Sequence, residues 1–465
     1  MISQNQKINR PYLFFIASAA ALGGFLFGYD TAIISGTISM VKTQFGLSIV
    51  SEGWFVSSAL VGCIIGVSFA GEMSDRFGRK SSLILSGFLF LISALGCSVC
   101  ATQTQLIIYR LVGGLGVGIA SMLSPLYISE ISPAHIRGRM VALYQFAITI
   151  GIVSAYFVNA SLLRLSETPV FPGPGGMLHQ IFVGEVWRAM LGSEAVPALL
   201  FLIMMFFVPS TPRWLVTKNK NEKAGKVLAK INSAETARLE LESIKSAIAK
   251  EDAGSWKMLF SKGVRMAVFT GMGLAILSQF TGINAIIYYG PRIMEEAGIR
   301  LSDAIGGQVI IGVVNMLATI FAIMKIDNYG RKTLMMGGIK GMFISLIIVG
   351  ILFFTGHTQG ILLLFFILTF ITSFAIGYGP VIWVLLSEIY PTRIRGRAMS
   401  LATLVLWIGT AIIGQVVPWM LSVLTPAGTF IVFALCCIPV PFILKLIPET
   451  KGLSLEEIEE TWRTN

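Results

Sequence analysis

Two charged residues, Asp30 and Arg110, lie inside long apolar stretches of the sequence, where a charge is costly. At the centre of a bilayer, each such side chain costs roughly 2.5–3.5 kcal/mol on insertion scales. If the two side chains meet, they suit proton chemistry. Arginine keeps its charge, whereas the pKa of a buried carboxylate is lowered by a nearby cation and raised by desolvation. The alternative is a static salt bridge that holds two helices together.

The composition indicates that these charges belong to a membrane protein. Of the 465 residues, 55% are hydrophobic and only 13% are charged, and the mean hydropathy is +0.78. Soluble domains carry roughly 25% charged residues. Only helix bundles and closed barrels satisfy their backbone amides in lipid, and continuous apolar runs of about 20 residues indicate helices. The sequence shows no nucleophile–base set, so an enzyme is the least favoured class.

The net charge of +11 follows a membrane topology and does not indicate a nucleic-acid surface. With Met1 inside and twelve helices, most Lys and Arg residues fall in cytoplasmic segments, above all in 213–265. This positive-inside bias predicts a multi-pass membrane protein with both termini in the cytoplasm. The few basic residues of the outer loops are Lys42, Arg164, Arg188, Arg292 and Arg300.

No metal, redox or cofactor chemistry is expected. All five cysteines fall in predicted helices, and the CxxC of Cys97 and Cys100 has no matching His or Cys pair. The glycine-rich stretch 113–118 lies in an apolar run with no strand before it. Its Gly114 and Gly118 form a GxxxG, which favours the close approach of two helices.

Two charged motifs occur twice in the chain. SEISPAHIRGR at 129–139 returns as SEIYPTRIRGR at 387–397, with eight of eleven positions identical, and DRFGRK at 75–80 returns as DNYGRK at 327–332. Two motifs that recur at nearly the same offset indicate a tandem duplication. We therefore expect an N-terminal six-helix half (1–212), a cytoplasmic helical linker (213–264), a C-terminal six-helix half (265–447) and a cytoplasmic tail (448–465).

The predicted fold class is an all-α membrane protein with twelve transmembrane helices. Six apolar runs precede the hydrophilic linker and six follow it. The predicted helices are 12–38, 53–71, 82–101, 106–129, 140–162, 187–208, 266–290, 304–325, 333–355, 361–386, 398–420 and 427–446.

Nine short motifs stand in an order and at helix positions typical of one family: GYD at 28–30, GEMSDRFGRK at 71–80, YRLVGGLGVG at 109–118, SEISPAHIRGR at 129–139, PSTPRWL at 209–215, SQFTGINAIIYY at 278–289, GPVIW at 379–383, SEIYPTRIRGR at 387–397 and PETKG at 448–452. By these motifs, the chain resembles the sugar-porter branch of the major facilitator superfamily over nearly its whole length. GYD and SEAVPALLF at 193–201 look most like bacterial xylose–proton symporters. PSTPR departs from the family's usual PESPR.

This resemblance implies two six-helix pseudo-repeats with the substrate site between them. It also implies that Asp30 and Arg110 meet between the first and fourth helices. Protonation of Asp30 would free Arg110 to find another partner, and Glu194 is the candidate by resemblance to the symporters.

A sugar site needs amide side chains for the hydroxyl groups and aromatic rings for the C–H faces. A helix break at Thr281 and Gly282 would let two of the amides face inward together. Ser278 stands where the family usually has a second glutamine, which removes one expected hydrogen-bonding arm. Gln415 matches no family position, and we interpret it as a packing residue. By resemblance, the candidate sugar contacts are Phe27, Gln145, Gln279, Asn284, Asn315, Trp383 and Trp407.

Two sets of residues are candidate gates. Tyr288 and Tyr289 are expected at an outer gate. The repeated charged motifs are expected to form an inner gate of ion pairs within each half, with Glu130 and Glu388 bound to arginines. Its candidate residues are Asp75, Arg79, Glu130, Arg137, Asp327, Arg331, Glu388 and Arg395.

The predicted function is uptake of a monosaccharide, D-xylose or a related pentose or hexose, coupled to inward proton flow by alternating access. A passive facilitator of the same sugars is the main alternative. A non-transporting membrane sugar sensor is less favoured, because such sensors usually carry long cytoplasmic tails. The expected partners are the sugar, protons and membrane lipid, with no nucleic acid and a functional monomer.

Overall fold

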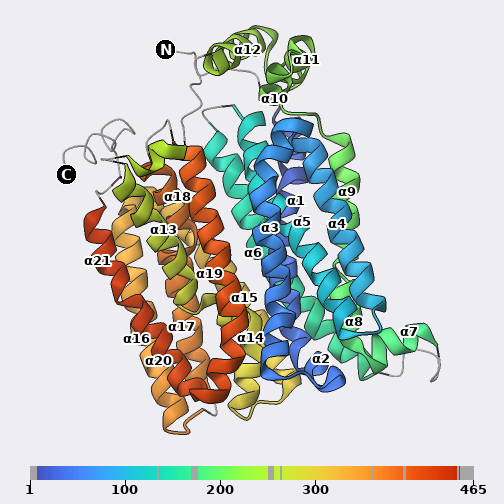
Figure 1. The fold of residues 1–465 in the computed structure, drawn as a ribbon, viewed down its shortest axis with the longest axis vertical. Coiled ribbons are helices and arrows are strands. Elements are labelled where there is room, and N and C mark those ends of the chain that lie inside the picture. The colour runs from blue at the N-terminus through green and yellow to red at the C-terminus, as the bar shows by residue number, and fades with distance from the viewer. Residues whose placement is uncertain are drawn as a thin grey trace.

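A computed structural model describes residues 8–133, 136–168, 176–249, 256–261, 264–358, 361–390, 394–447 and 450. In this part of the chain the only regular elements are helices, and they form 12 spans long and apolar enough to cross a membrane. The protein is therefore a multi-pass membrane protein. The spans lie side by side as one bundle, with the helices of the predicted linker gathered at one end (Figure 1). We call this the linker end and the opposite one the distal end.

Of the nine helices before the linker, seven form the first six spans, and the short helices α2 and α7 lie between spans. A short break divides the sixth span into α8 and α9, because Pro197 cannot donate the helical bond to the Ser193 carbonyl. Cys100 lies one residue beyond α4, not inside it as predicted. The helices are α1 (Arg10–Ile33), α2 (Ile38–Phe45), α3 (Ile49–Phe77), α4 (Arg79–Val99), α5 (Gln103–Ile131), α6 (Arg137–Ser166), α7 (Met177–His179), α8 (Val186–Gly192) and α9 (Ala195–Phe207).

Three amphipathic helices of the hydrophilic linker pack on this first half, at the linker end. The Asn9 amide donates to the Ile231 carbonyl at 2.8 Å, which joins the start of α1 to the linker. Trp214 Nε1 donates to the Asp75 carbonyl at 3.1 Å at the end of α3. The linker helices are α10 (Pro212–Thr217), α11 (Asn221–Ile231) and α12 (Ala234–Ala249), followed by a 3₁₀ turn at Trp256–Phe260.

The last six spans repeat the arrangement of the first six. The seventh span breaks at Gly282, whose φ of 89° few other residues adopt, as the predicted break at Thr281 and Gly282 requires. The halves pack mainly through α3 against α19 and α6 against α15. The helices are α13 (Arg265–Phe280), α14 (Ile283–Glu296), α15 (Leu301–Tyr329), α16 (Arg331–Phe354), α17 (Ile361–Gly377), α18 (Gly379–Ile389), α19 (Arg395–Val423), α20 (Thr425–Cys437) and α21 (Pro439–Leu446).

The predicted helix ranges overlap all 12 spans, but most were too short. The second predicted helix, 53–71, is Ile49–Phe77, and the seventh, 266–290, reaches Glu296. Hydropathy marks the segment in lipid, whereas the helices continue into the polar regions at both ends. The charged motifs therefore lie on these helix ends. In both copies of DxxGRK, the glycine ends one helix and precedes the next, with a positive φ of 94° at Gly78 and 88° at Gly330.

Three prolines inside the spans share one feature that the sequence analysis missed. A proline cannot donate to the carbonyl four residues earlier, and in lipid that carbonyl needs another donor. In each case the hydroxyl of a tyrosine from a neighbouring helix donates to it. Pro125, Pro291 and Pro418 free the carbonyls of Ser121, Ile287 and Gly414, which accept from Tyr144 at 3.3 Å, Tyr156 at 3.1 Å and Tyr289 at 2.5 Å.

Candidate functional site

A buried ion pair lies in the middle of the N-terminal half. Arg110 Nη1 on α5 donates to Asp30 Oδ1 on α1 at 2.6 Å, and the two side chains are 4% and 7% exposed. This separation is typical of a charge-assisted hydrogen bond. Removing either charge would leave the other buried without its partner, a change that usually costs several kcal/mol.

Close helix packing brings the two charges together. A Cβ on Gly28 would lie 2.0 Å from the Ile148 carbonyl of α6, so only glycine lets α1 approach α6 this closely. On α5, a Cβ on Gly114 or Gly118 would lie 1.9 Å from the Ala59 carbonyl or 2.4 Å from the Cys63 carbonyl of α3. The predicted role of this GxxxG in close helix approach is confirmed.

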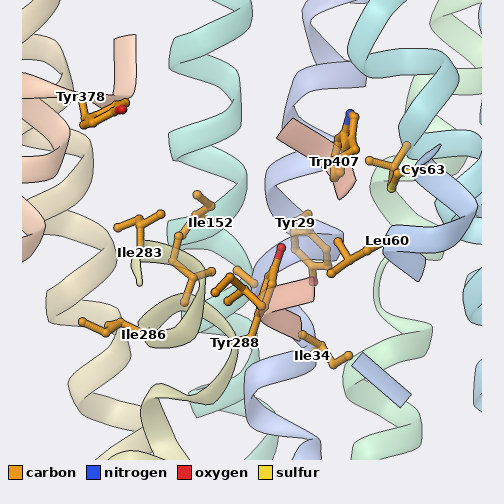
Figure 2. Packing of buried hydrophobic residues seen from close by; sticks show 14 of the residues in the cluster. Tyr29, Ile34, Leu60, Cys63, Ile152, Ile283, Ile286, Tyr288, Tyr378 and Trp407 are labelled. Carbon is orange, nitrogen blue, oxygen red and sulfur yellow. The ribbon is translucent and has the colours of Figure 1, made fainter. Parts of the chain in front are cut away.

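A small cavity lies against the ion pair and reaches the other half of the protein. It has a volume of about 10 Å³, which is room for about one water molecule. Asp30 and Arg110 line it together with Cys63 from the N-terminal half, and Tyr288 and Trp407 from the C-terminal half. Figure 2 shows Tyr288 and Trp407 facing Leu60 and Cys63 around this space. Residues of the predicted outer gate and sugar site therefore share one cavity wall with the ion pair.

Glu194 lies at the break between α8 and α9 and is 3% exposed. Within the described part of the chain, its Oε1 atom has no hydrogen-bond partner. A hydrogen bond of 2.7 Å between the hydroxyls of Tyr29 and Ser193 joins the residue before Asp30 to the residue before Glu194. Within the part of the chain that the structure describes, a buried carboxylate with one unpaired oxygen thus lies next to the helix that carries Asp30.

The amide side chains at the break of the seventh span form one cluster. Gln279 Oε1 accepts from Asn284 Nδ2 and, at 3.0 Å, from Thr410 Oγ1 of α19. Gln279 Nε2 donates to Ser278 Oγ at 2.8 Å. Ser278, expected only to remove a hydrogen-bonding arm, therefore also holds the Gln279 carboxamide in place. Sequence reasoning missed Thr410, which nothing in its local pattern marks.

The other candidate sugar contacts come from both halves. Phe27 of α1 and Trp407 of α19 lie with ring centroids 5.2 Å apart, so these two aromatic rings meet across the halves. Gln145 on α6, Asn315 on α15 and Trp383 on α18 are half-buried.

The two predicted gate tyrosines differ in what they contact. Tyr289 is fully buried, and its hydroxyl donates to Gly414 of α19 in its own half. Tyr288, its neighbour in sequence, faces the N-terminal half and lines the cavity beside Asp30. Tyr288 therefore lies where a movement between the halves would change its surroundings.

At the linker end, the repeated motifs form matching ion pairs. Arg79 lies 3.0 Å from Glu130 in the N-terminal half, and Arg331 lies 2.9 Å from Glu388 in the C-terminal half. Asp75 adds a bond of 2.9 Å to Arg79. Each pair thus braces the end of its own half.

The remaining residues of the predicted inner gate behave differently. Arg137 is exposed at the start of α6, and Arg395 Nε donates to the Tyr390 carbonyl at 3.3 Å. The Asp327 side chain lies outside the described residues. The lysines of DxxGRK, which sequence reasoning passed over, bind the carbonyl end of the last span in each half: Lys80 to Phe206 at 2.8 Å and Lys332 to Ile447 at 2.6 Å.

At the distal end, polar contacts join the two halves. Gln415 on α19 donates to the Val50 carbonyl at 3.1 Å and accepts from Ser57 at 2.8 Å, so it is more than the packing residue we predicted. Ser39 donates to Glu295 at 2.6 Å, and Arg292 pairs with Glu52. The distal end is therefore closed in this conformation.

Residues 16–462 match the family described as "Sugar (and other) transporter". The chain is 39% identical over 455 residues to the arabinose-proton symporter of Bacillus subtilis, covering 97% of this chain and 95% of that protein. It is 37% identical over 492 residues to the D-xylose-proton symporter of Escherichia coli, covering 98% and 97%. A partially occluded inward open structure of the xylose transporter XylE from E. coli matches with a TM-score of 0.82 at 36% identity, covering 96% of this chain and 100% of that one.

Proposed function

The chain belongs to the sugar transporters of the major facilitator superfamily, and we propose that it carries a monosaccharide inward together with a proton by alternating access. The proteins that it resembles are transporters and not enzymes. The observation that carries the proposal is the buried Asp30–Arg110 pair, whose cavity is also lined by Tyr288 and Trp407 of the opposite half.

The substrate we propose first is a pentose, D-xylose or arabinose, because relatives that cover nearly the whole chain are symporters named for these sugars. A related hexose is the next candidate, since it differs from a pentose by one CH₂OH group. Gln279, Asn284, Gln145 and Asn315 would bind the hydroxyl groups. The rings of Phe27, Trp383 and Trp407 would cover the apolar face of the sugar.

The proposed coupling step is a change of partner for Arg110. A proton on Asp30 removes the charge that holds Arg110 at 2.6 Å. Arginine keeps its own charge, so Arg110 must then find another anion. Glu194 is this anion, because its carboxylate is buried on the span next to α1 and has one unpaired oxygen. Tyr288 of the outer gate and Trp407 of the sugar site line the same cavity, so the protonation state of Asp30 can affect both.

The alternative function is a passive facilitator of the same sugars. Cells that express the protein should accumulate labelled xylose or arabinose above the external concentration, and a protonophore should remove that accumulation. If the internal concentration only ever equals the external one, with or without protonophore, the protein is a facilitator.

Trp383→Ala should weaken sugar binding about threefold to tenfold, because contact with an aromatic ring is worth about 0.5–1.5 kcal/mol. Equilibrium binding of xylose and arabinose to purified protein measures this. Trp419→Ala is the matched control, since Trp419 lies on α19 with half of its side chain exposed. Equal affinities in the two variants would remove Trp383 from the site.

The orientation we propose places the linker end in the cytoplasm of a bacterial cell and the protein in the inner membrane as a functional monomer surrounded by lipid. The concentration of Lys and Arg in 213–265 supports this orientation. The division into two halves (1–212 and 265–447), a linker (213–264) and a tail (448–465) is part of the same proposal. Most of that tail lies outside the described residues.

In this orientation, Tyr288 and Tyr289 belong to an outer gate and the repeated charged motifs to an inner gate. The ion pairs of Asp75, Arg79 and Glu130, and of Arg331 and Glu388, give each half a preformed charged rim. Arg137, Asp327 and Arg395 complete the proposed set. These rims would meet when the halves rock and the distal end opens.

Glu130→Gln should raise the fraction of molecules with the cytoplasmic end open, because the amide no longer holds Arg79 in the rim. The measurement is the rate at which a membrane-impermeant maleimide modifies a cysteine placed between the halves at that end, in inside-out vesicles. Glu72→Gln, an exposed residue on α3 of the same half, is the matched control. A modification rate no different from that of the control would exclude Glu130 from the gate.

A further inference from the structure

Glu52 is a fully buried carboxylate that the proposed transport step does not use. It lies in the first turn of α3, at the distal end, with 0% of its side chain exposed. Ser48 caps the same helix start, and the partial positive charge of a helix N-terminus favours an anion there. Within the described residues, neither oxygen of Glu52 accepts a hydrogen bond of normal geometry. Its compensation must therefore come from cations.

Two cations approach Glu52, one from each half. Arg292 of α14 pairs with Oε1, and Lys42 of α2 lies 3.1 Å from Oε2. The Arg292 side chain is 11% exposed, whereas that of Lys42 is 38% exposed. Burial lowers the pKa of Lys42, and the nearby Arg292 adds to this shift while Glu296 opposes it. Arg292 is the more buried of the two cations and comes from the opposite half, so its pair with Glu52 is the contact that joins the halves.

Other contacts between α14 and the N-terminal half lie near this pair. Tyr156 of α6 donates to the Ile287 carbonyl that Pro291 frees, and Ser39 donates to Glu295 at 2.6 Å. A cavity of about 350 Å³, lined by Lys42, Arg292 and the carboxylates of Glu295 and Glu296 among others, lies beside the pair. Water in this cavity can solvate the charges as they separate, so the pair can break without leaving bare charges in lipid.

We propose that Glu52 and Arg292 form an inter-half ion latch that holds the distal end closed, and that the latch must break each time this end opens. The latch adds a gating contact to the transport cycle. It rests on the proposed function in one respect, which is that the two ends of the bundle open in turn. Breaking the pair from either half should have the same effect, because both variants remove the same bond.

The experiment measures the separation of the halves directly. Spin labels at Val50→Cys on α3 and Val423→Cys on α19 would report the distal opening by double electron–electron resonance, since both side chains are exposed at that end. The full chain in lipid nanodiscs would carry Cys436→Ala, because Cys436 is the one half-buried native cysteine. Glu52→Gln should raise the ratio of long to short distances roughly tenfold, equal to about 1.4 kcal/mol.

Arg292→Gln is the second variant and should give the same shift even where Glu52→Gln fails to fold. The double variant should exceed neither single variant. Glu185→Gln is the matched control, because Glu185 pairs with Arg188 within its own half at the same end. Distance distributions that match this control in both variants would overturn the latch. The readout needs neither sugar nor protons, so a failure of the proposed symport would show in uptake and leave this result standing.

Discussion

Asp30→Asn should abolish accumulation of sugar against a gradient while leaving exchange of labelled for unlabelled sugar across the membrane. Asparagine has the shape of the protonated acid but cannot release a proton. Because it carries no charge, Arg110 loses the anionic partner that lies 2.6 Å away in the native protein. In the proposed mechanism, this variant keeps the protonated arrangement permanently. The steady-state ratio of internal to external sugar should therefore fall to unity, whereas counterflow persists.

Asp303→Asn is the matched control for this prediction, because Asp303 is an exposed aspartate at the start of α15 that pairs only locally with Arg300. It should retain full accumulation. Concentrative uptake by Asp30→Asn would show that Asp30 does not carry the coupled proton. Loss of counterflow together with uptake would instead indicate a structural salt bridge, the alternative interpretation of this pair.

Gln279→Leu should weaken sugar binding roughly 30-fold, corresponding to about 2 kcal/mol. Its carboxamide links Ser278, Asn284 and Thr410, so the variant removes one hydrogen-bonding group from the site and releases the others from their positions. A leucine of similar volume leaves no cavity, which separates the loss of polar contacts from a packing defect. Isothermal titration of the purified protein with xylose and arabinose measures the change.

The matched control for Gln279→Leu is Gln180→Leu, which changes an exposed glutamine at the distal surface. Thr410→Val should give a smaller loss, because it removes only the 3.0 Å bond that orients Gln279. If Gln279→Leu binds both sugars as tightly as the Gln180 variant does, the amide cluster is not the sugar site.

The fold could be predicted from the sequence because its signals are local and redundant. Each span is a continuous apolar run, and the duplicated motifs locate the two halves around a hydrophilic linker. The break at Gly282 could also be anticipated, since a glycine beside polar residues in an apolar run interrupts a helix. The ion pair of Asp30 and Arg110 stands out for the same reason, because charge in lipid is expensive.

The contacts between the halves could not be predicted in this way. In the sequence, Glu52 and Gln415 look no different from polar residues that face solvent or only fill space. Their partners become visible once α3 is seen to approach α14 and α19. The tyrosine hydroxyls that satisfy proline-freed carbonyls depend on neighbouring helices far away in sequence, as for Tyr156 and Ile287. Such pairs carry no periodicity or spacing that a single sequence shows.

Joint movement of sugar and proton can be measured as proton uptake when sugar is added to de-energised vesicles. Right-side-out vesicles that contain the protein, with no gradient of ions or sugar, receive a pulse of xylose or arabinose while the external pH is recorded. We expect a transient alkalinisation of the medium that disappears in Asp30→Asn and is kept in Asp303→Asn. Sugar entry with no change of external pH would contradict this expectation and would identify the protein as a passive facilitator.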